Sequence, residues 1–249
     1  MTTVDTLQKF GHWVSPIRID DAVVDSLCEA SDMTVRHVSA APTDSSSRVV
    51  TDGDGVAYVR RVGKLWARSA VFAEFMASQQ IMLIAEDAIG GCALPVNAQL
   101  VIKHARETQG IDWHFDPDPP GKLRPPFDYV IGVYLDHSTV ANGALRVVEG
   151  SHLWTLADRR EWIRSHRDSS TSSSTGDPIS LYCAAGTVCL HERGIIHGSP
   201  PNTTYTQRRT VYLHYRSEQM LRETKGPDYV DRLRESLASV STSGSSHDI

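Results

Sequence analysis

The stretch from which the chain can be interpreted is Trp113-His114-Phe115-Asp116, in which a histidine and a carboxylate stand one residue apart among strand-forming side chains. In an extended strand, residues two apart point to the same face, with a rise of about 3.3 Å per residue. His114 and Asp116 can therefore reach one metal ion from the same wall. A lone His-x-Asp pattern is weak, but the flanking Trp113 and Phe115 indicate an apolar face. Inward-facing polar groups there need a partner that offsets their desolvation, and a metal ion is such a partner.

A catalytic metal site needs a third protein ligand and must keep its remaining positions open. The best candidate is His197, within the segment Gly194-Ile195-Ile196-His197-Gly198-Ser199. The segment 186–191 is typical of a strand, which would deliver the chain into a turn carrying His197. His191 lies at the end of that strand, so we expect it to pack beside the site rather than to bind metal.

Arg208 lies eleven positions past His197, at the entrance of a predicted strand. A guanidinium group there could form a two-pronged, charge-assisted contact with a carboxylate placed next to the metal. Arg209 is the alternative anchor if the strand is out of register by one residue. A metal triad with an arginine beside it indicates a site for a co-substrate.

Composition limits the class of protein. The chain has 249 residues with 40% hydrophobic and 22% charged side chains, which is typical of one globular domain. The net charge of -5 argues against a nucleic-acid surface and favours a small-molecule partner. No Cys-x-x-Cys pair occurs among four cysteines, which predicts free buried thiols in a reducing compartment. Residues 1–30 show no continuous apolar segment, so we expect no signal peptide, no membrane association and a cytoplasmic protein; the oligomeric state, monomer or homodimer, stays open.

Residues 1–92 are expected to form a mainly helical support with one hairpin. Apolar spacing predicts a short helix over 20–30, a hairpin over 48–62 around the turn at 52–55, and one long or two abutting helices over 65–89. The pair Gly90-Gly91 is a natural helix stop.

Residues 93–217 change to short β-rich runs separated by turn signals, which predicts a sandwich or barrel. The expected strands cover 94–103, 112–116, 129–135, 144–148, 179–183, 187–191 and 209–215.

Two interruptions and the C-terminus complete the prediction. The proline-rich segment 117–126 should form part of the mouth of the site, and the segment 153–177 should be a helix over 154–166 followed by a mobile surface loop. Residues 218–249 are expected to carry a helix over 228–238 and a disordered tail.

Three motifs in order resemble the phytanoyl-CoA dioxygenase (PhyH) family of iron(II)- and 2-oxoglutarate-dependent oxygenases. They are Trp113 to Asp116, then Asn142-Gly143-Ala144-Leu145-Arg146-Val147-Val148-Glu149-Gly150-Ser151-His152, then His197-Gly198-Ser199-Pro200-Pro201-Asn202 with Arg208. The resemblance covers about half of the chain. The family usually has a proline where this chain has Glu149, a departure that affects a turn rather than the ligands.

The resemblance implies a double-stranded β-helix, or jelly roll, with flanking helices and a site near one open end. It assigns iron(II) to His114, Asp116 and His197, the distal carboxylate of 2-oxoglutarate to Arg208 and Ser199, and a pocket-lining role to Gln99. The implied reaction uses O2 to oxidise a C–H bond and releases succinate and carbon dioxide. Related halogenases have a small residue in place of Asp116, so hydroxylation is favoured here, with desaturation, epoxidation and ring closure still open.

Two other functions compete with this one. A jelly-roll metal enzyme without 2-oxoglutarate, such as an isomerase or a cofactor-independent dioxygenase, would make Arg208 incidental. A non-catalytic small-molecule sensor could keep the fold without turnover. The segments that would choose the substrate contain no interpretable motif, and only analogy with bacterial relatives suggests specialised metabolism.

Overall fold

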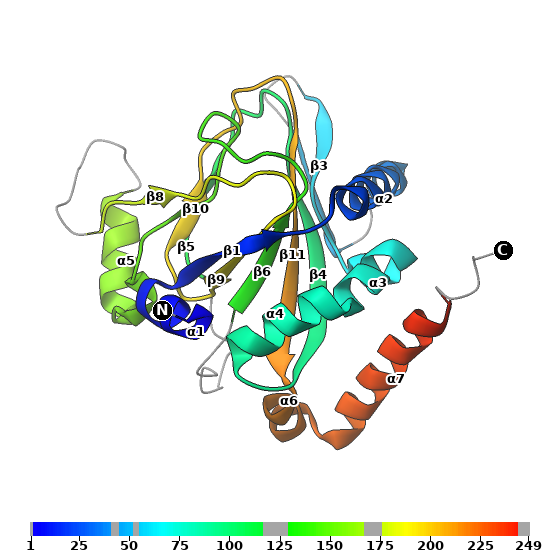
Figure 1. Ribbon diagram of the computed structural model, residues 1–249. Helices are drawn as coiled ribbons and strands as arrows, with labels where there is room; N and C mark the ends of the chain where they lie inside the picture. Colours follow the sequence, from blue (N-terminus) through cyan, green and yellow to red (C-terminus); the bar gives the residue numbers. More distant parts are fainter. Residues whose placement is uncertain (1, 41–44, 52–54, 117–128, 167–175, 244–249) are drawn as a thin grey trace.

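Two antiparallel β-sheets pack against each other in the computed structural model, which describes residues 2–40, 45–51, 55–116, 129–166 and 176–243 (Figure 1). Within these residues the larger sheet has seven strands, in the order β1 (His12–Arg18), β9 (Thr187–Glu192), β6 (Tyr129–Tyr134), β11 (Arg208–Ser217), β4 (Ala93–Lys103), β3 (Ala57–Gly63) and β2 (Ser47–Thr51). The smaller sheet, in the same described part, has four strands, in the order β5 (Ile111–His114), β10 (His197–Ser199), β7 (Arg146–Val147) and β8 (Ile179–Ser180).

The larger sheet has one apolar and one polar face, because side chains alternate along each strand. On β11, Val211 and Leu213 are buried in the main hydrophobic core. Tyr212 and His214, which alternate with these two residues, point to the opposite face and line a cavity between the sheets. The apolar face is covered by helices, and the polar face is free to build a site.

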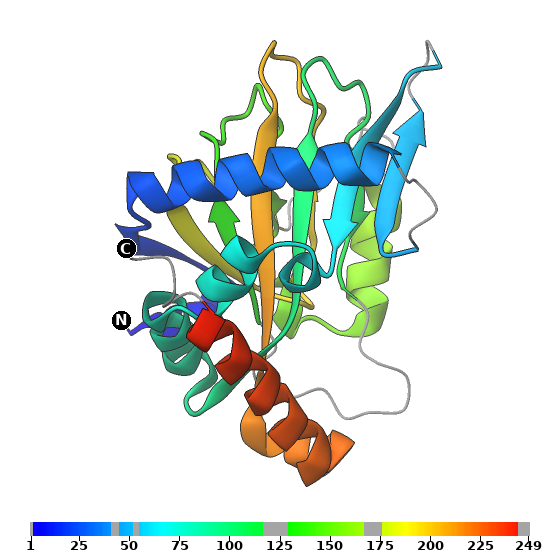
Figure 2. The ribbon, with the colours of Figure 1, turned by 90° about the vertical axis from the view of Figure 1, so that its right-hand side faces the viewer.

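Helices α2 (Asp21–Ala40), α3 (Ala70–Ala77) and α4 (Gln79–Ile89) cover the apolar face. Figure 2 shows α2 running across the strands of the larger sheet. The other helices are α1 (Thr3–Phe10), α5 (Leu156–Ser165), α6 (Glu218–Lys225) and α7 (Pro227–Ser243), and short 3-10 turns span Leu65–Ala67 and Ser151–Leu153. Helix α5 packs on the smaller sheet, where its Trp162 meets Trp113 edge to face with ring centroids 5.2 Å apart.

The structure differs from the predicted elements in several places. Helix α1 was not predicted, and α2 continues to Ala40 rather than ending at residue 30. The periodicity predicts no strand before residue 48, but β1 forms an edge of the larger sheet, where its Pro16 is tolerated because one side of the strand needs no partner. His197 begins strand β10 rather than lying in a turn. Helix α6 was not predicted because Leu221 is its only buried residue in the described part. Helix α7 continues to Ser243, so residues 239–243 are helical rather than disordered.

Other expectations hold locally or fall outside the described residues. Helix α4 ends at Gly90, whose left-handed φ of 74° lets its N–H bond the Glu86 carbonyl. Cysteines 28, 92, 183 and 189 all lie in the described part and are free thiols, although Cys92 is exposed rather than buried. The predicted mouth at 117–126 and most of the predicted loop after α5 lie outside the described residues. Among the helices described, none combines the length and apolarity that crossing a membrane requires.

Candidate metal centre and cavity

The three predicted metal ligands converge at one end of the smaller sheet. His114 ends β5, Asp116 follows two residues later, and His197 begins the neighbouring strand β10, where it pairs directly with His114. The two imidazole rings are 4.1 Å apart between centroids. One ligand atom from each of the three residues lies within 4.8 Å of the other two. The structure therefore brings together, from segments about 80 residues apart, a set that could hold one ion.

Backbone carbonyls orient both imidazole rings. Nδ1 of His114 donates to the Asp112 carbonyl at 2.8 Å, and Nδ1 of His197 donates to the Ile195 carbonyl at 3.0 Å. A carbonyl can only accept, so each Nδ1 carries the proton and each Nε2 keeps its lone pair for a metal. The ligand form of each ring is set by the backbone carbonyl two residues before it.

Asp116 is held by the turn that precedes β10. Its backbone N–H donates to the Arg193 carbonyl at 2.8 Å, and its Oδ2 lies 3.6 Å from Nε of Arg193. This contact places the carboxylate beside the two imidazoles while one cation balances part of its charge.

Burial keeps His197 in the form that binds metal. Desolvation, with the nearby His114 as the next cause, lowers the pKa of His197 to about 3. Desolvation likewise lowers the pKa of His191 to about 3. His191 packs 5.0 Å from the His197 ring and is outside the ligand set, as predicted. Both rings are neutral at pH 7.

A cavity of about 660 Å³ opens beside the ligands and is lined from both sheets. All six predicted site residues line it: His114, Asp116 and His197 from the metal end, with Gln99, Ser199 and Arg208. Gln99 lies on β4, with its Nε2 3.4 Å from Nε2 of His214. The structure thus places the predicted residues in one space, while their roles remain predictions.

Arg208 and Ser199 have polar atoms without internal partners. The Arg208 side chain is buried, with Nη1 donating to Thr210 Oγ1 at 3.0 Å. Within the described part of the chain, Arg208 Nε and Ser199 Oγ have no hydrogen-bond partner although both atoms are buried. Orphaned buried donors are costly and rare, and they mark places where a ligand completes the structure. A carboxylate in the cavity would fit both.

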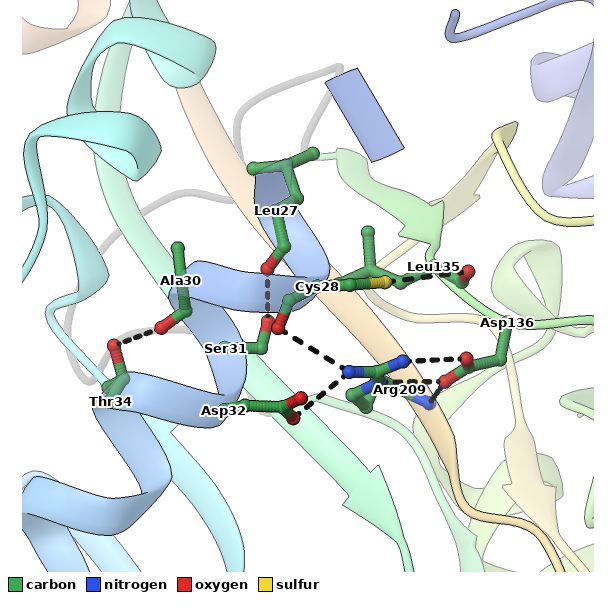
Figure 3. A network of polar contacts seen from close by, with 9 residues as sticks. All are labelled: Leu27, Cys28, Ala30, Ser31, Asp32, Thr34, Leu135, Asp136 and Arg209. Carbon is green, nitrogen blue, oxygen red and sulfur yellow. Dashed lines mark hydrogen bonds and ion pairs between the residues drawn. The ribbon is translucent and has the colours of Figure 1, made fainter. Parts of the chain in front are cut away.

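Arg209, the alternative anchor, forms ion pairs outside the cavity (Figure 3). Its Nε and Nη2 donate to the two carboxylate oxygens of Asp136 at 3.0 and 2.9 Å, and its Nη1 reaches Asp32 of α2 at 3.0 Å. The side chain thus leaves the cavity face and ties β11 to α2. Of the two arginines, only Arg208 belongs to the cavity lining.

Two more buried cations stand near Arg208. Lys103 lies directly opposite Arg208 on β4 and donates to the Pro200 carbonyl at 2.6 Å. Desolvation first, and then the charge of Arg208, lower the pKa of Lys103 to about 7. Arg60 is paired with buried Glu107 at 2.8 Å. Positive charge therefore exceeds negative charge in this corner of the described structure, which favours a bound anion.

Several polar lining residues had no predicted function, among them Arg48, Arg60, Arg61, Tyr212 and His214. His214 faces the cavity, where its Nε2 lies 3.4 Å from Nε2 of Gln99. A sequence signal existed for two of them, since Tyr212 and His214 share the alternation of Arg208 along one strand. Arg48, Arg60 and Arg61 had no comparable signal.

Other motif residues have structural roles. Trp113 packs in the cluster under α5, and the Arg146 guanidinium lies 5.2 Å from its ring centroid. The ring of His152 braces the Gln8 carbonyl at 3.0 Å. Glu149, where the family usually has proline, accepts from His12 of β1 at 2.8 Å. The departure therefore anchors the edge strand.

Comparison with known sequences supports the resemblance. The profile of the family described as phytanoyl-CoA dioxygenase (PhyH) matches residues 16–210. A curated relative, the "Probable alpha-ketoglutarate-dependent hypophosphite dioxygenase" of Stutzerimonas stutzeri, is 28% identical over 113 residues, which cover 42% of this chain and 37% of the relative. The match therefore spans well under two thirds of that relative's length.

Solved structures share the fold. AviO1 from Streptomyces viridochromogenes Tue57 superposes with a TM-score of 0.73 at 19% identity, covering 86% of this chain and 93% of that one. EctD from S. alaskensis, solved with 2-oxoglutarate and 5-hydroxyectoine, gives 0.69 at 20% identity, covering 87% and 75%. The carbocyclase SnoK from nogalamycin biosynthesis gives 0.69 at 17% identity, covering 86% and 82%. These likenesses confirm the predicted jelly roll with flanking helices.

Proposed function

Because this chain belongs to the phytanoyl-CoA dioxygenase family, we propose that it is an iron(II)- and 2-oxoglutarate-dependent dioxygenase that oxidises a C–H bond of a small organic molecule, most simply by hydroxylation. The observation that carries the proposal is a two-histidine, one-carboxylate set in the same cavity as the buried guanidinium of Arg208, whose Nε has no partner among the described residues. Two histidines and a carboxylate on one side of an ion are typical of non-haem iron(II) oxygenases.

The residues fit both groups. His114, Asp116 and His197 would hold iron(II) with the remaining coordination positions facing the cavity. When bound, iron(II) with 2-oxoglutarate supplies the oxidising power: O2 is consumed, succinate and carbon dioxide are released, and one oxygen atom is available for the substrate.

The chain's own part is to bind, orient and shield. Arg208 and Ser199 would receive the distal carboxylate of 2-oxoglutarate through charge-assisted hydrogen bonds, satisfying Arg208 Nε and Ser199 Oγ. Gln99, Tyr212 and His214 line the space that the substrate would enter. Apolar packing beneath the larger sheet supports this wall, against which the substrate would be oriented for reaction.

The size of the cavity supports an organic substrate. Its volume of about 660 Å³ falls in the range of about 300 to 1,000 Å³ that is usual for small-molecule sites. A hypophosphite ion, which the name of the curated relative gives as a substrate of that protein, would fill only a small part of such a space. Hypophosphite nevertheless belongs among the compounds to be tested.

The test is the formation of succinate from 2-oxoglutarate under air, with purified protein and iron(II), across a panel of amino acids, specialised metabolites and hypophosphite. Oxidised product is identified by mass spectrometry. A substrate should raise succinate formation in proportion to product. His114→Ala is the blank, because it removes one ligand while leaving the cavity.

Two results would favour the competing functions. Substrate conversion without succinate would point to a metal enzyme that does not use 2-oxoglutarate. Tight iron binding with neither oxygen uptake nor succinate across the panel would point to a sensor. Equilibrium dialysis against Mn(II) and 2-oxoglutarate separates these outcomes from a protein that binds no metal.

A further inference from the structure

The hairpin of β2 and β3 forms the edge of the larger sheet beside the cavity and contributes three arginines to its lining: Arg48, Arg60 and Arg61. On a regular strand, adjacent residues such as Arg60 and Arg61 would point to opposite faces. Here the pairing shifts by one residue, since Arg48 pairs with Arg61 while Val49 pairs with Val59. Arg60 is thus the extra residue of a β-bulge, a device that re-aims side chains. The bulge explains how both neighbours reach the cavity.

The terminal nitrogens of Arg60 already have partners within the chain, whereas its buried Nε has none among the described residues. Arg60 is buried, its Nη2 donates to the Gln109 and Gly110 carbonyls at 2.8 and 2.7 Å, and it is paired with Glu107. These contacts fasten the hairpin to the segment that leads into β5. Arg60 therefore positions the hairpin.

Arg48 and Arg61, called the hairpin arginines below, are in the opposite situation. They stand directly opposite each other across the two strands, and both are exposed. Neither has an ion-pair or hydrogen-bond partner anywhere in the described residues. Like charges directly opposite in a sheet are destabilising, so this pair costs stability unless an anion lies between the two.

Two other charged residues of the cavity already have proposed roles. Asp116 belongs to the metal set, and Arg208 faces the proposed 2-oxoglutarate carboxylate. Asp112 is the remaining carboxylate in the described lining, and it forms no ion pair with either hairpin arginine. The hairpin end of the cavity is therefore cationic and lies apart from the metal end.

From these contacts we propose that Arg48 and Arg61 bind an oxyanion group of the organic substrate, a carboxylate or a phosphoryl group. This inference rests on the proposed function, and it names the substrate class: an elongated molecule that is anionic at one end and oxidised at the other. Guanidinium pairs suit such groups because they offer several donors in a fixed geometry.

The chain itself sets the length of that substrate. Arg60 fastens the hairpin to Gly110, and the extended segment from Gly110 leads to the ligand His114. Four residues of strand span about 13 Å. With side chains reaching inward from both ends, the anionic group and the oxidised carbon lie roughly 10 Å apart.

The test uses matched probes rather than the unknown substrate. Octanoate and octanamide have similar shape and differ in charge, octyl phosphate replaces the carboxylate by a phosphoryl group, and inorganic phosphate is the head group alone. Each is titrated by calorimetry into the metal-free protein and into the protein loaded with Mn(II) and 2-oxoglutarate. The wild-type protein should bind octanoate or octyl phosphate about tenfold tighter than octanamide, which corresponds to about 1.4 kcal/mol.

The double variant Arg48→Gln/Arg61→Gln should lose this preference for the anion, and Arg48→Lys/Arg61→Lys should keep part of it. Lys64→Gln is the matched control, because Lys64 is an exposed cation next to β3 that does not line the cavity. Losing the repulsion should leave the Tm of the double glutamine variant no lower than that of the wild type. If that variant does not fold, Arg48→Gln alone is measured.

Three results would overturn the proposal: equal binding of octanoate and octanamide by the wild type, an undiminished preference in the double glutamine variant, or no binding of any anionic probe up to about 10 mM. Preference for octyl phosphate over octanoate, or the reverse, identifies the oxyanion. Mn(II) and 2-oxoglutarate binding without probes is measured in the same series. Failure of the metal centre and failure of the anion site are therefore separate outcomes.

Discussion

The two ends of the cavity differ in whether their polar groups have partners within the chain. The metal end is built by β5 and β10, and the hairpin end by β2 and β3. At the metal end each imidazole is held by a backbone carbonyl and the carboxylate by Arg193, so the three groups are oriented before any ion arrives. At the hairpin end the hairpin arginines have no partner in the described structure. The difference indicates that one end is preorganised for a single small ion, whereas the other leaves its charge available to a variable ligand.

The largest effect is expected from removing a ligand at the metal end. Asp116→Ala should lower the affinity for Mn(II) by at least about 100-fold and abolish succinate formation, since groups that merely support ligands are worth roughly 10- to 100-fold. Dialysis with metal analysis measures it. Asp112→Asn is the control, because that side chain is exposed and lies outside the ligand set. Unchanged affinity in Asp116→Ala would place the ion elsewhere.

The next largest effect is expected from substituting Arg208, which lies between the two ends. Arg208→Gln should raise the Kd of 2-oxoglutarate by about 10- to 100-fold in Mn(II)-loaded protein, because charge-assisted hydrogen bonds contribute about 1.5 to 3 kcal/mol. Mn(II) affinity should stay at the wild-type value. Arg209→Gln serves as the comparison, since its side chain leaves the cavity. If Arg209→Gln weakens 2-oxoglutarate binding more, the assignment of the anchor is wrong.

Arg209 should act on stability instead. Losing its contacts with Asp136 and Asp32 leaves carboxylates without their cation, and Arg209→Gln should lower the free energy of unfolding by about 2 kcal/mol. Urea unfolding measures the change. A double-mutant cycle with Asp136→Asn should show that the two losses do not add. Strictly additive losses would mean that the pair contributes no coupling energy.

The smallest effect is expected for the pH dependence of stability, and it comes from His214 on the cavity wall. Desolvation, followed by the charge of Arg216, lowers the pKa of His214 to about 4. The folded protein therefore keeps this ring neutral at pH 5, while the unfolded chain, with a pKa near 6.5, takes up a proton. Stability falls as pH decreases from about 6.5 towards 4, because the unfolded state binds more protons there.

We expect His214→Gln to reduce this fall by about 1 kcal/mol between pH 7.5 and pH 5, a value discounted for the partial exposure of the ring. Urea unfolding of metal-free protein at the two pH values gives the difference, and neither protein should gain stability at pH 5. Equal falls in wild type and variant would show that His214 titrates normally in the folded state.

Prediction from the sequence succeeded where the relevant geometry is local. The alternation of a strand was enough to place His114 and Asp116 on one wall, and a glycine able to adopt positive φ was enough to end α4 at Gly90. Prediction failed where local signals are short or mixed. Strand β10 has only three residues, and Pro16 within β1 is untypical of a strand. The choice between Arg208 and Arg209 could not be made locally, because both are arginines at a strand entrance.

The sequence by itself determined the family and the jelly roll and singled out the three residues that converge, since these predictions depend on short spacings and on motifs in a fixed order. Only the tertiary structure decided which arginine faces the cavity, because Arg209 is drawn away by Asp136 and Asp32, which are 73 and 177 positions distant. It also decided the charge of the hairpin end, because a one-residue shift between β2 and β3 turns both Arg60 and Arg61 inward. Pairing register and distant ion pairs are set by packing of the whole chain, and no local pattern encodes them.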